Sequence, residues 1–103
     1  MKKIFIVEDE IGYIQPLKQQ LTENGYKVTY SLNGHEGLKN ALKEHPELIL
    51  LDIMMPVMDG LTTLKELRKD EWGGKAKVIL LSNLSDTENI QKALEFNVHD
   101  YLV

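Results

Sequence analysis

Leu48-Ile49-Leu50-Leu51-Asp52 is the stretch that decides the fold. A continuous apolar run of this length is typical of a strand that is covered on both faces, as in a parallel sheet. The run continues to Ile53 and carries its only charge at Asp52, and a charge at the end of an apolar run seldom lacks a partner. We therefore predict a buried central strand over Leu48–Ile53 that delivers Asp52 to its carboxyl end.

Shorter apolar runs on either side alternate with amphipathic segments. We expect strands over Lys3–Val7, Val28–Ser31, Lys77–Leu81 and Asp100–Val103, and helices over Ile11–Glu23, Glu36–Lys43, Leu61–Lys69 and Thr87–Phe96. Strands that alternate with helices of this length indicate βαβ units, a parallel sheet and right-handed crossovers. The sequence thus predicts a single α/β domain over residues 1–103.

Pro16 conflicts with the helix expected over Ile11–Glu23. It lies about a turn and a half into that helix. A missing N–H has no cost only in the first turn, so Pro16 lies beyond the tolerated positions. We expect that the helix either starts later or is kinked at this residue.

Composition narrows the classes of function. The chain has 103 residues, of which 43% are hydrophobic and 27% are charged, an ordinary composition for a soluble domain. The net charge of -4 argues against direct binding of nucleic acid. No cysteine is present, which excludes disulfides, thiol catalysis and cysteine-based metal sites. Since no apolar stretch approaches the length of a membrane span or a signal-peptide core, we expect a cytoplasmic protein without membrane contact.

Polar side chains stand at the ends of three expected strands. Glu8 and Asp9 follow the first, Asp52 ends the third and Ser82 follows the fourth. Open parallel sheets bind ligands outside the carboxyl ends of their strands. Three close carboxylates would raise one another's pKa values, and a hard divalent cation would relieve the repulsion. Oxygen ligands suit Mg²⁺, with Mn²⁺ as the alternative ion.

This charge arrangement suggests phosphoryl chemistry. A cation held by the carboxylates can bridge to phosphoryl oxygens, and Asp52 can act as a nucleophile that forms an aspartyl-phosphate. The Ser82 hydroxyl could then bond a phosphoryl oxygen. Each feature also has a simpler reading, because Glu8 and Asp9 could be acids that favour the start of a helix, and Ser82 could be no more than the end of a strand.

Four segments together resemble the receiver domain of bacterial two-component response regulators. They are Val7–Glu10, Leu50–Gly60, Leu80–Asn83 and Asp100–Val103. The resemblance covers the whole chain in order and spacing, and Asp52–Gly60 is its most specific part. It implies a doubly wound, flavodoxin-like fold of three layers, with a parallel sheet of strand order 2-1-3-4-5.

The resemblance also implies a role for each site residue. Glu8 and Asp9 correspond to the acidic pair that binds the metal, and Asp52 to the phosphoacceptor, which is also a metal ligand. The backbone carbonyl of Met54 corresponds to a further metal ligand. Ser82 corresponds to the hydroxyl that senses the phosphoryl group, and Tyr101 to the aromatic switch residue.

The chain departs from the family after Tyr101, where the family has a Lys and then a last helix. Because the sequence ends at Val103, we expect a receiver domain that is truncated at its C-terminus. Loss of the helix would uncover apolar side chains on strands one, three and four. We therefore expect self-association through that face.

The resulting hypothesis is a phosphoacceptor that switches protein–protein contacts. A histidine kinase or a phosphotransfer protein would donate the phosphoryl group, and a downstream protein partner would receive the signal. The chain would not be an enzyme beyond self-phosphorylation and autodephosphorylation at Asp52. One alternative is a scaffold that only binds or self-associates. A small Mg²⁺-dependent phosphohydrolase is less favoured, because Met54 stands where such enzymes carry a second acid.

Overall fold

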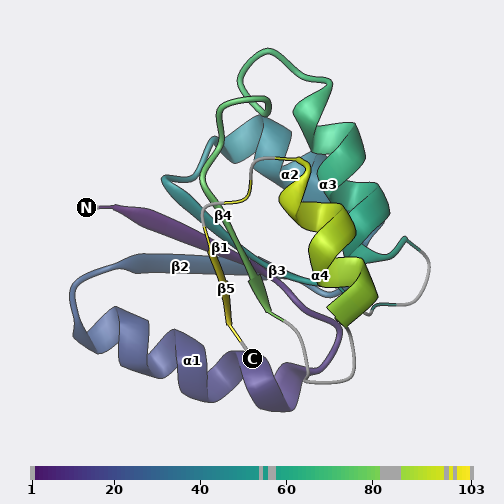
Figure 1. The fold of residues 1–103 in the computed structure, drawn as a ribbon. Coiled ribbons are helices and arrows are strands. Elements are labelled where there is room, and N and C mark those ends of the chain that lie inside the picture. Colours follow the sequence, from purple (N-terminus) through teal and green to yellow (C-terminus); the bar gives the residue numbers. More distant parts are fainter. Residues whose placement is uncertain are drawn as a thin grey trace.

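A computed structural model describes residues 2–53, 55, 58–81, 87–96, 98 and 100–102, with the backbone alone for 87–90 and 100–102. Its strands are β1 (Lys3–Val7), β2 (Lys27–Ser31), β3 (Leu48–Asp52), β4 (Val78–Leu81) and β5 (Asp100–Leu102). Its helices are α1 (Ile11–Glu23), α2 (Gly34–Glu44), α3 (Gly60–Arg68) and α4 (Thr87–Leu94) (Figure 1). All the expected elements are therefore present, with bounds that differ by three residues or fewer.

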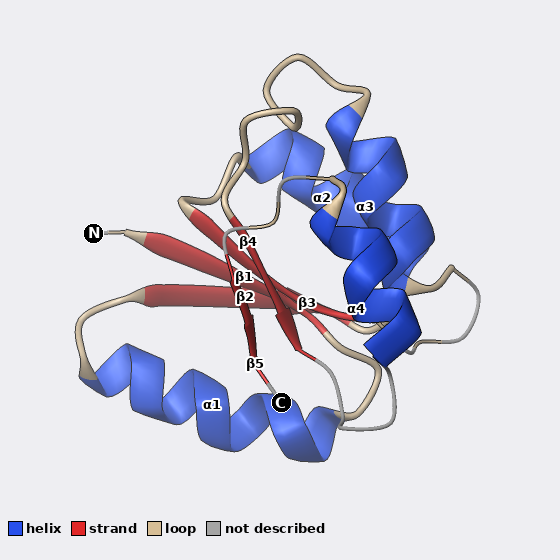
Figure 2. Cartoon of the chain, in the orientation of Figure 1, coloured by secondary structure: helices blue, strands red, loops and turns tan. Residues whose placement is uncertain are grey.

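The strands form one parallel sheet, as the alternation of elements predicts, and its order β2-β1-β3-β4-β5 is the one that the family resemblance implies. β3 pairs with β1 on one side and with β4 on the other, so it is the central strand. Helix α1 lies on one face of the sheet, and α2, α3 and α4 lie on the other, which gives three layers (Figure 2). No helix among the described residues is long and apolar enough to span a membrane.

Side chains of β3 alternate between two apolar clusters because successive residues of a strand point to opposite faces. Ile49 and Leu51 belong to the larger cluster beneath α2 and α3, and Leu50 belongs to the smaller cluster beneath α1. All three are buried. The prediction from the uninterrupted apolar run, a strand covered on both faces, is confirmed.

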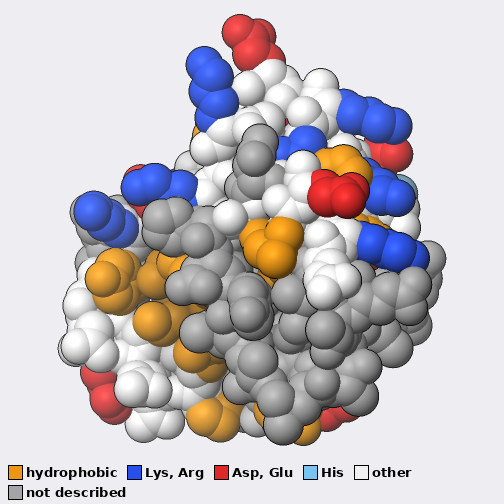
Figure 3. Space-filling model, in the orientation of Figure 1, with side chains coloured by type: hydrophobic (Ala, Val, Ile, Leu, Met, Phe, Trp, Pro, Cys, Tyr) orange, Lys and Arg blue, Asp and Glu red, His pale blue; other side chains and the backbone are white. Residues whose placement is uncertain are grey.

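Cover on the α1 face is uneven. Ile6 and Leu50 are buried there, whereas Ile79 and Leu81 of β4 are only half-buried. In Figure 3 hydrophobic side chains reach the surface between α1 and the sheet. The expectation that strands one, three and four all lose cover is thus wrong for β1 and for Leu50 of β3, because α1 packs over them through Ile14.

Pro16 does not delay the start of its helix. α1 begins at Ile11, and the N–H groups of Tyr13 and Ile14 already donate to the carbonyl of Glu10. Ile14 is 1% exposed, so packing against the sheet fixes these first turns. The alternative of a later start is wrong, and Pro16 lies inside the helix.

Because the two faces of β4 are covered unequally, substitutions of two neighbouring leucines should lower the free energy of unfolding by different amounts. Leu80→Ala removes a fully buried side chain and should cost about 2–5 kcal/mol in the free energy of unfolding. Leu81→Ala removes the same atoms from the half-covered face and should cost about 1 kcal/mol. Urea unfolding measures both, and equal costs would contradict this description of the α1 face.

Candidate metal and phosphoryl site

Three carboxylates meet at one edge of the sheet. Glu8 and Asp9 directly follow β1, and Asp52 is the last residue of β3. β1 and β3 are paired in a register that sets Val7 beside Leu51, so the two chains leave the sheet side by side. One carboxylate oxygen from each of the three residues lies within 4.8 Å of the others. The predicted convergence of these side chains is confirmed.

Glu8 is the most buried member of this acidic cluster, with 8% of its surface exposed. Burial raises the pKa of its carboxyl group to about 8, and the hydrogen bond with Asp9 and the negative charge of Asp52 act in the same direction. The backbone N–H of Glu10 donates to Glu8 Oε1 at 3.2 Å, which opposes the shift. The sequence suggested repulsion as the cause, whereas burial contributes more.

This donor set fits a hard divalent cation. Carboxylate oxygens are the ligands that Mg²⁺ takes in proteins, usually one or two of them together with water and substrate oxygens. A divalent cation would offset the negative charge that the buried Glu8 cannot carry alone. The side chains of Glu8, Asp9 and Asp52 could therefore hold Mg²⁺.

The far end of the loop that follows Asp52 is held against β3. The N–H of Gly60 donates to the carbonyl of Ile53 at 2.8 Å. A Cβ at Gly60 would lie well inside 3.0 Å of the Asp52 carbonyl oxygen, so only glycine fits here. Asp59 caps α3 by accepting from the N–H of Thr62 at 2.8 Å, which fixes the start of that helix.

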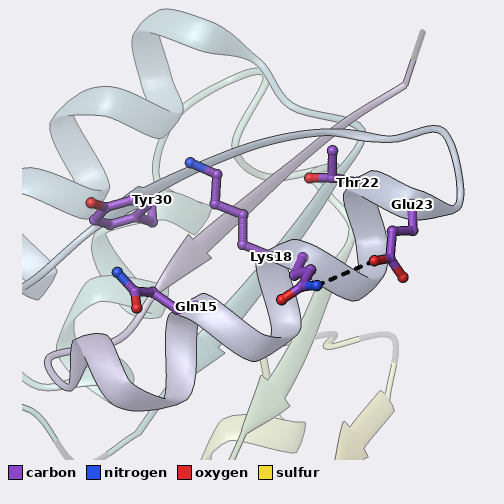
Figure 4. Close-up of a pocket in the computed structure, with 6 residues that line it drawn as sticks. Gln15, Lys18, Thr22, Glu23 and Tyr30 are labelled. Carbon is purple, nitrogen blue, oxygen red and sulfur yellow. Dashed lines mark hydrogen bonds between the residues drawn. The ribbon is translucent and has the colours of Figure 1, made fainter.

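Three predicted site residues are not tested by this geometry. Met54 and Ser82 lie outside the described residues, and Tyr101 is described only as part of the backbone of β5. A separate hollow lies between α1 and β2, lined by Gln15, Lys18, Gln19, Thr22, Glu23 and Tyr30 (Figure 4). None of the three carboxylates lines that hollow.

Known proteins share both this fold and this order of elements. The model of the response regulator receiver domain matches residues 4–103. The chain belongs to this family. Receiver domains are signalling domains of two-component systems rather than conventional enzymes, and they interact with histidine kinases or phosphotransfer proteins.

Three comparisons illustrate the similarity. A probable transcriptional regulator, ycf27 of Cyanophora paradoxa, is 38% identical over 99% of this chain. The response regulator TrrA of Thermotoga maritima, solved in complex with Mg²⁺–BeF, superposes with a TM-score of 0.87 at 35% identity, over 100% of this chain and 86% of that one. The receiver domain of the Pseudomonas aeruginosa sensor histidine kinase PA1611 was solved with a magnesium ion in its active-site cleft. It superposes with a TM-score of 0.90 at 27% identity, over 99% of this chain and 84% of that one.

The chain covers much less of its curated relatives than of these solved receiver domains. It spans 41% of the length of the Cyanophora protein. The similarity therefore concerns less than half of that relative.

The raised pKa of Glu8 predicts how the stability of the metal-free receiver domain depends on pH. Between pH 4.5 and about 8 the Glu8 carboxyl is ionised in the unfolded chain but protonated in the folded one. Binding of the Glu8 proton therefore stabilises the folded state. This stabilisation is complete below pH 4.5 and is lost as the pH rises through about 8. Glu8→Gln removes this dependence, because its amide does not titrate.

Urea unfolding of both proteins across this range in EDTA measures the effect. The variant should gain stability relative to the wild type as the pH rises. Stability curves that run parallel would contradict the raised pKa.

Proposed function

We propose that this chain is the phosphoacceptor of a two-component phosphorelay and that Asp52 carries the phosphoryl group. The observation that carries the proposal is the meeting of three carboxylates at the carboxyl end of the central strand, within 4.8 Å of one another. Asp52 is the best candidate because it ends β3, between β1 and β4, where ligands reach an open parallel sheet. We propose that residues 1–103 act as one receiver domain in the cytoplasm.

Glu8, Asp9, Asp52 and the backbone carbonyl of Met54 would hold the metal. Bound Mg²⁺ would neutralise negative charge on the phosphoryl oxygens. Glu8 would give up its proton to bind the cation, because the positive charge would offset the burial and the negative charge that raise the pKa of its carboxyl group. Asp9 and Glu8 would hold the cation beside Asp52, since both follow a strand that pairs with β3.

Asp52 acts as the nucleophile. One of its carboxylate oxygens forms a bond to phosphorus while the phosphorus–nitrogen bond of a donor phosphohistidine breaks. The electron pair of the broken bond stays on the imidazole nitrogen, which takes up a proton. Ser82 would donate its hydroxyl to a phosphoryl oxygen, and Tyr101 would respond to the movement of Ser82.

The donor is a histidine kinase or a phosphotransfer protein, and the signal passes to a downstream protein partner rather than to nucleic acid. The net charge of -4 supports a protein partner. The half-covered Ile79 and Leu81 support self-association through the α1 face. Light scattering at high concentration tests this last proposal, and a monodisperse monomer would exclude it.

Phosphorylation of Asp52 is tested by incubating the chain with acetyl phosphate and Mg²⁺ and recording its intact mass. The wild type should gain one phosphoryl group, and Asp52→Asn should gain none. Asp59→Asn is the matched control, because Asn also caps a helix and Asp59 lies outside the acidic cluster. An unmodified wild type that is shown to be folded would support a scaffold that only binds.

The metal ligands are tested by a second pair of neighbouring residues. Asp9→Asn removes a carboxylate from the acidic cluster and should weaken Mg²⁺ binding at least about tenfold, the low end of what changes around metal sites cost. Glu10→Gln removes the adjacent charge, which lies outside the cluster, and should leave the affinity nearly unchanged. Calorimetric titration with MgCl₂ measures both affinities. Equal losses of affinity would indicate that Mg²⁺ responds to the overall negative charge of the region rather than to a ligand at Asp9.

A further inference from the structure

The first residue of α2 packs against the loop that follows β3. Gly34 is buried, and a Cβ built on it would lie well inside 3.0 Å of the carbonyl oxygen of Met58 and of the hydroxyl of Thr63. Real Cβ atoms essentially never come so close to another atom. A larger residue at Gly34 must therefore displace either α2 or this loop.

The loop ends in a network that transmits such a displacement. The hydroxyl of Thr63 donates to the carbonyl of Asp59 at 2.8 Å, next to Met58. Gly60 in turn donates to the carbonyl of Ile53, one residue after the phosphoacceptor candidate. A Cβ at Gly60 would also lie well inside 3.0 Å of the Asp52 carbonyl oxygen, so the end of the loop packs against the backbone of that candidate.

Helix α2 is held more firmly than the loop. A Cβ at Gly37 would come within 2.7 and 2.9 Å of the two methyl groups of Val7, so α2 already touches β1 and cannot move closer to it. Asn33 caps the helix by accepting from the N–H of Glu36 at 2.9 Å. Asn40 donates to the buried Ser31 hydroxyl at 2.9 Å, which ties α2 to β2. We therefore expect the loop end at Met58, which is half-exposed, to move rather than α2.

We propose that Gly34 is a positioning residue for the metal site, because its missing side chain lets α2 support the loop end from Met58 to Gly60, which packs against the backbone of Asp52. The inference rests on the proposed function, since it concerns the same Mg²⁺ site. It assigns to α2, which contributes none of the three carboxylates, a role in setting metal affinity.

Gly34→Ala tests this role, with Gly73→Ala as its matched control. A Cβ at Gly73 would also lie inside 3.0 Å of a backbone carbonyl oxygen, that of Leu67, but Gly73 precedes β4 and so stands at the opposite edge of the sheet. Both variants should lose stability. In calorimetric titrations well below their melting temperatures, Gly34→Ala should bind Mg²⁺ about tenfold more weakly, the low end of what support residues of metal sites cost, and Gly73→Ala should match the wild type.

Phosphorylation by acetyl phosphate gives a second readout. Gly34→Ala should be modified slowly at low Mg²⁺ and at the wild-type rate at saturating Mg²⁺, which loss of folding alone would not produce. Wild-type affinity in a folded Gly34→Ala would overturn the inference and leave the proposed function intact. A wild type that binds no Mg²⁺ would overturn the proposed function itself.

Thr63→Val covers the case in which Gly34→Ala does not fold. It removes the hydrogen bond to the Asp59 carbonyl at a buried position, without a clash between α2 and a backbone atom. Weaker Mg²⁺ binding in Thr63→Val supports control of the site by the loop. Unchanged affinity would overturn the inference.

Discussion

The concentration of three carboxylates at the carboxyl ends of β1 and β3 is the constraint on which the rest of the structure depends. Parallel pairing of these strands forces Glu8 and Asp52 together, and the burial of Glu8 removes the water that would otherwise screen them. The cluster is stable only when a proton or a cation compensates its charge. That requirement links the fold to the metal binding that we propose.

The sheet makes this charge arrangement possible because its core is covered on both faces. Leu50 and Leu51 lie two and one residues before Asp52 and fill opposite clusters, so β3 is held on both faces close to the site. The loop beyond Asp52 is then closed by the Gly60 hydrogen bond and supported from α2 by Gly34. Paired strands thus bring the carboxylates together, and α2 packs against the end of the loop that follows Asp52.

Local sequence pattern was sufficient for much of this architecture. The continuous run at Leu48–Asp52 predicted a doubly covered central strand, and the acids at the strand ends predicted the cluster, because both depend on rules of parallel sheets. The start of α2 was placed two residues late, since the cap by Asn33 was not recognised. The contact of Gly34 with Met58 joins segments 24 residues apart in the sequence, and no local pattern reports it.

The main cause of the Glu8 pKa shift could not be predicted from the sequence either. Repulsion follows from the number of acids, but burial depends on how the chain packs around Glu8. The stacking of His45 on Trp72 at 4.2 Å is a similar case, because each residue alone reads as an ordinary surface position. In both, the decisive contact is tertiary.

The most direct test of the central claim is the free energy of unfolding of the wild type as a function of Mg²⁺ concentration, at constant ionic strength and without a phosphoryl donor. A cation that binds the folded cluster alone stabilises the protein by RT ln(1 + [Mg²⁺]/Kd). We predict that stability rises with Mg²⁺ along this curve and does not rise when KCl replaces MgCl₂. A free energy of unfolding that is independent of Mg²⁺ would contradict the account.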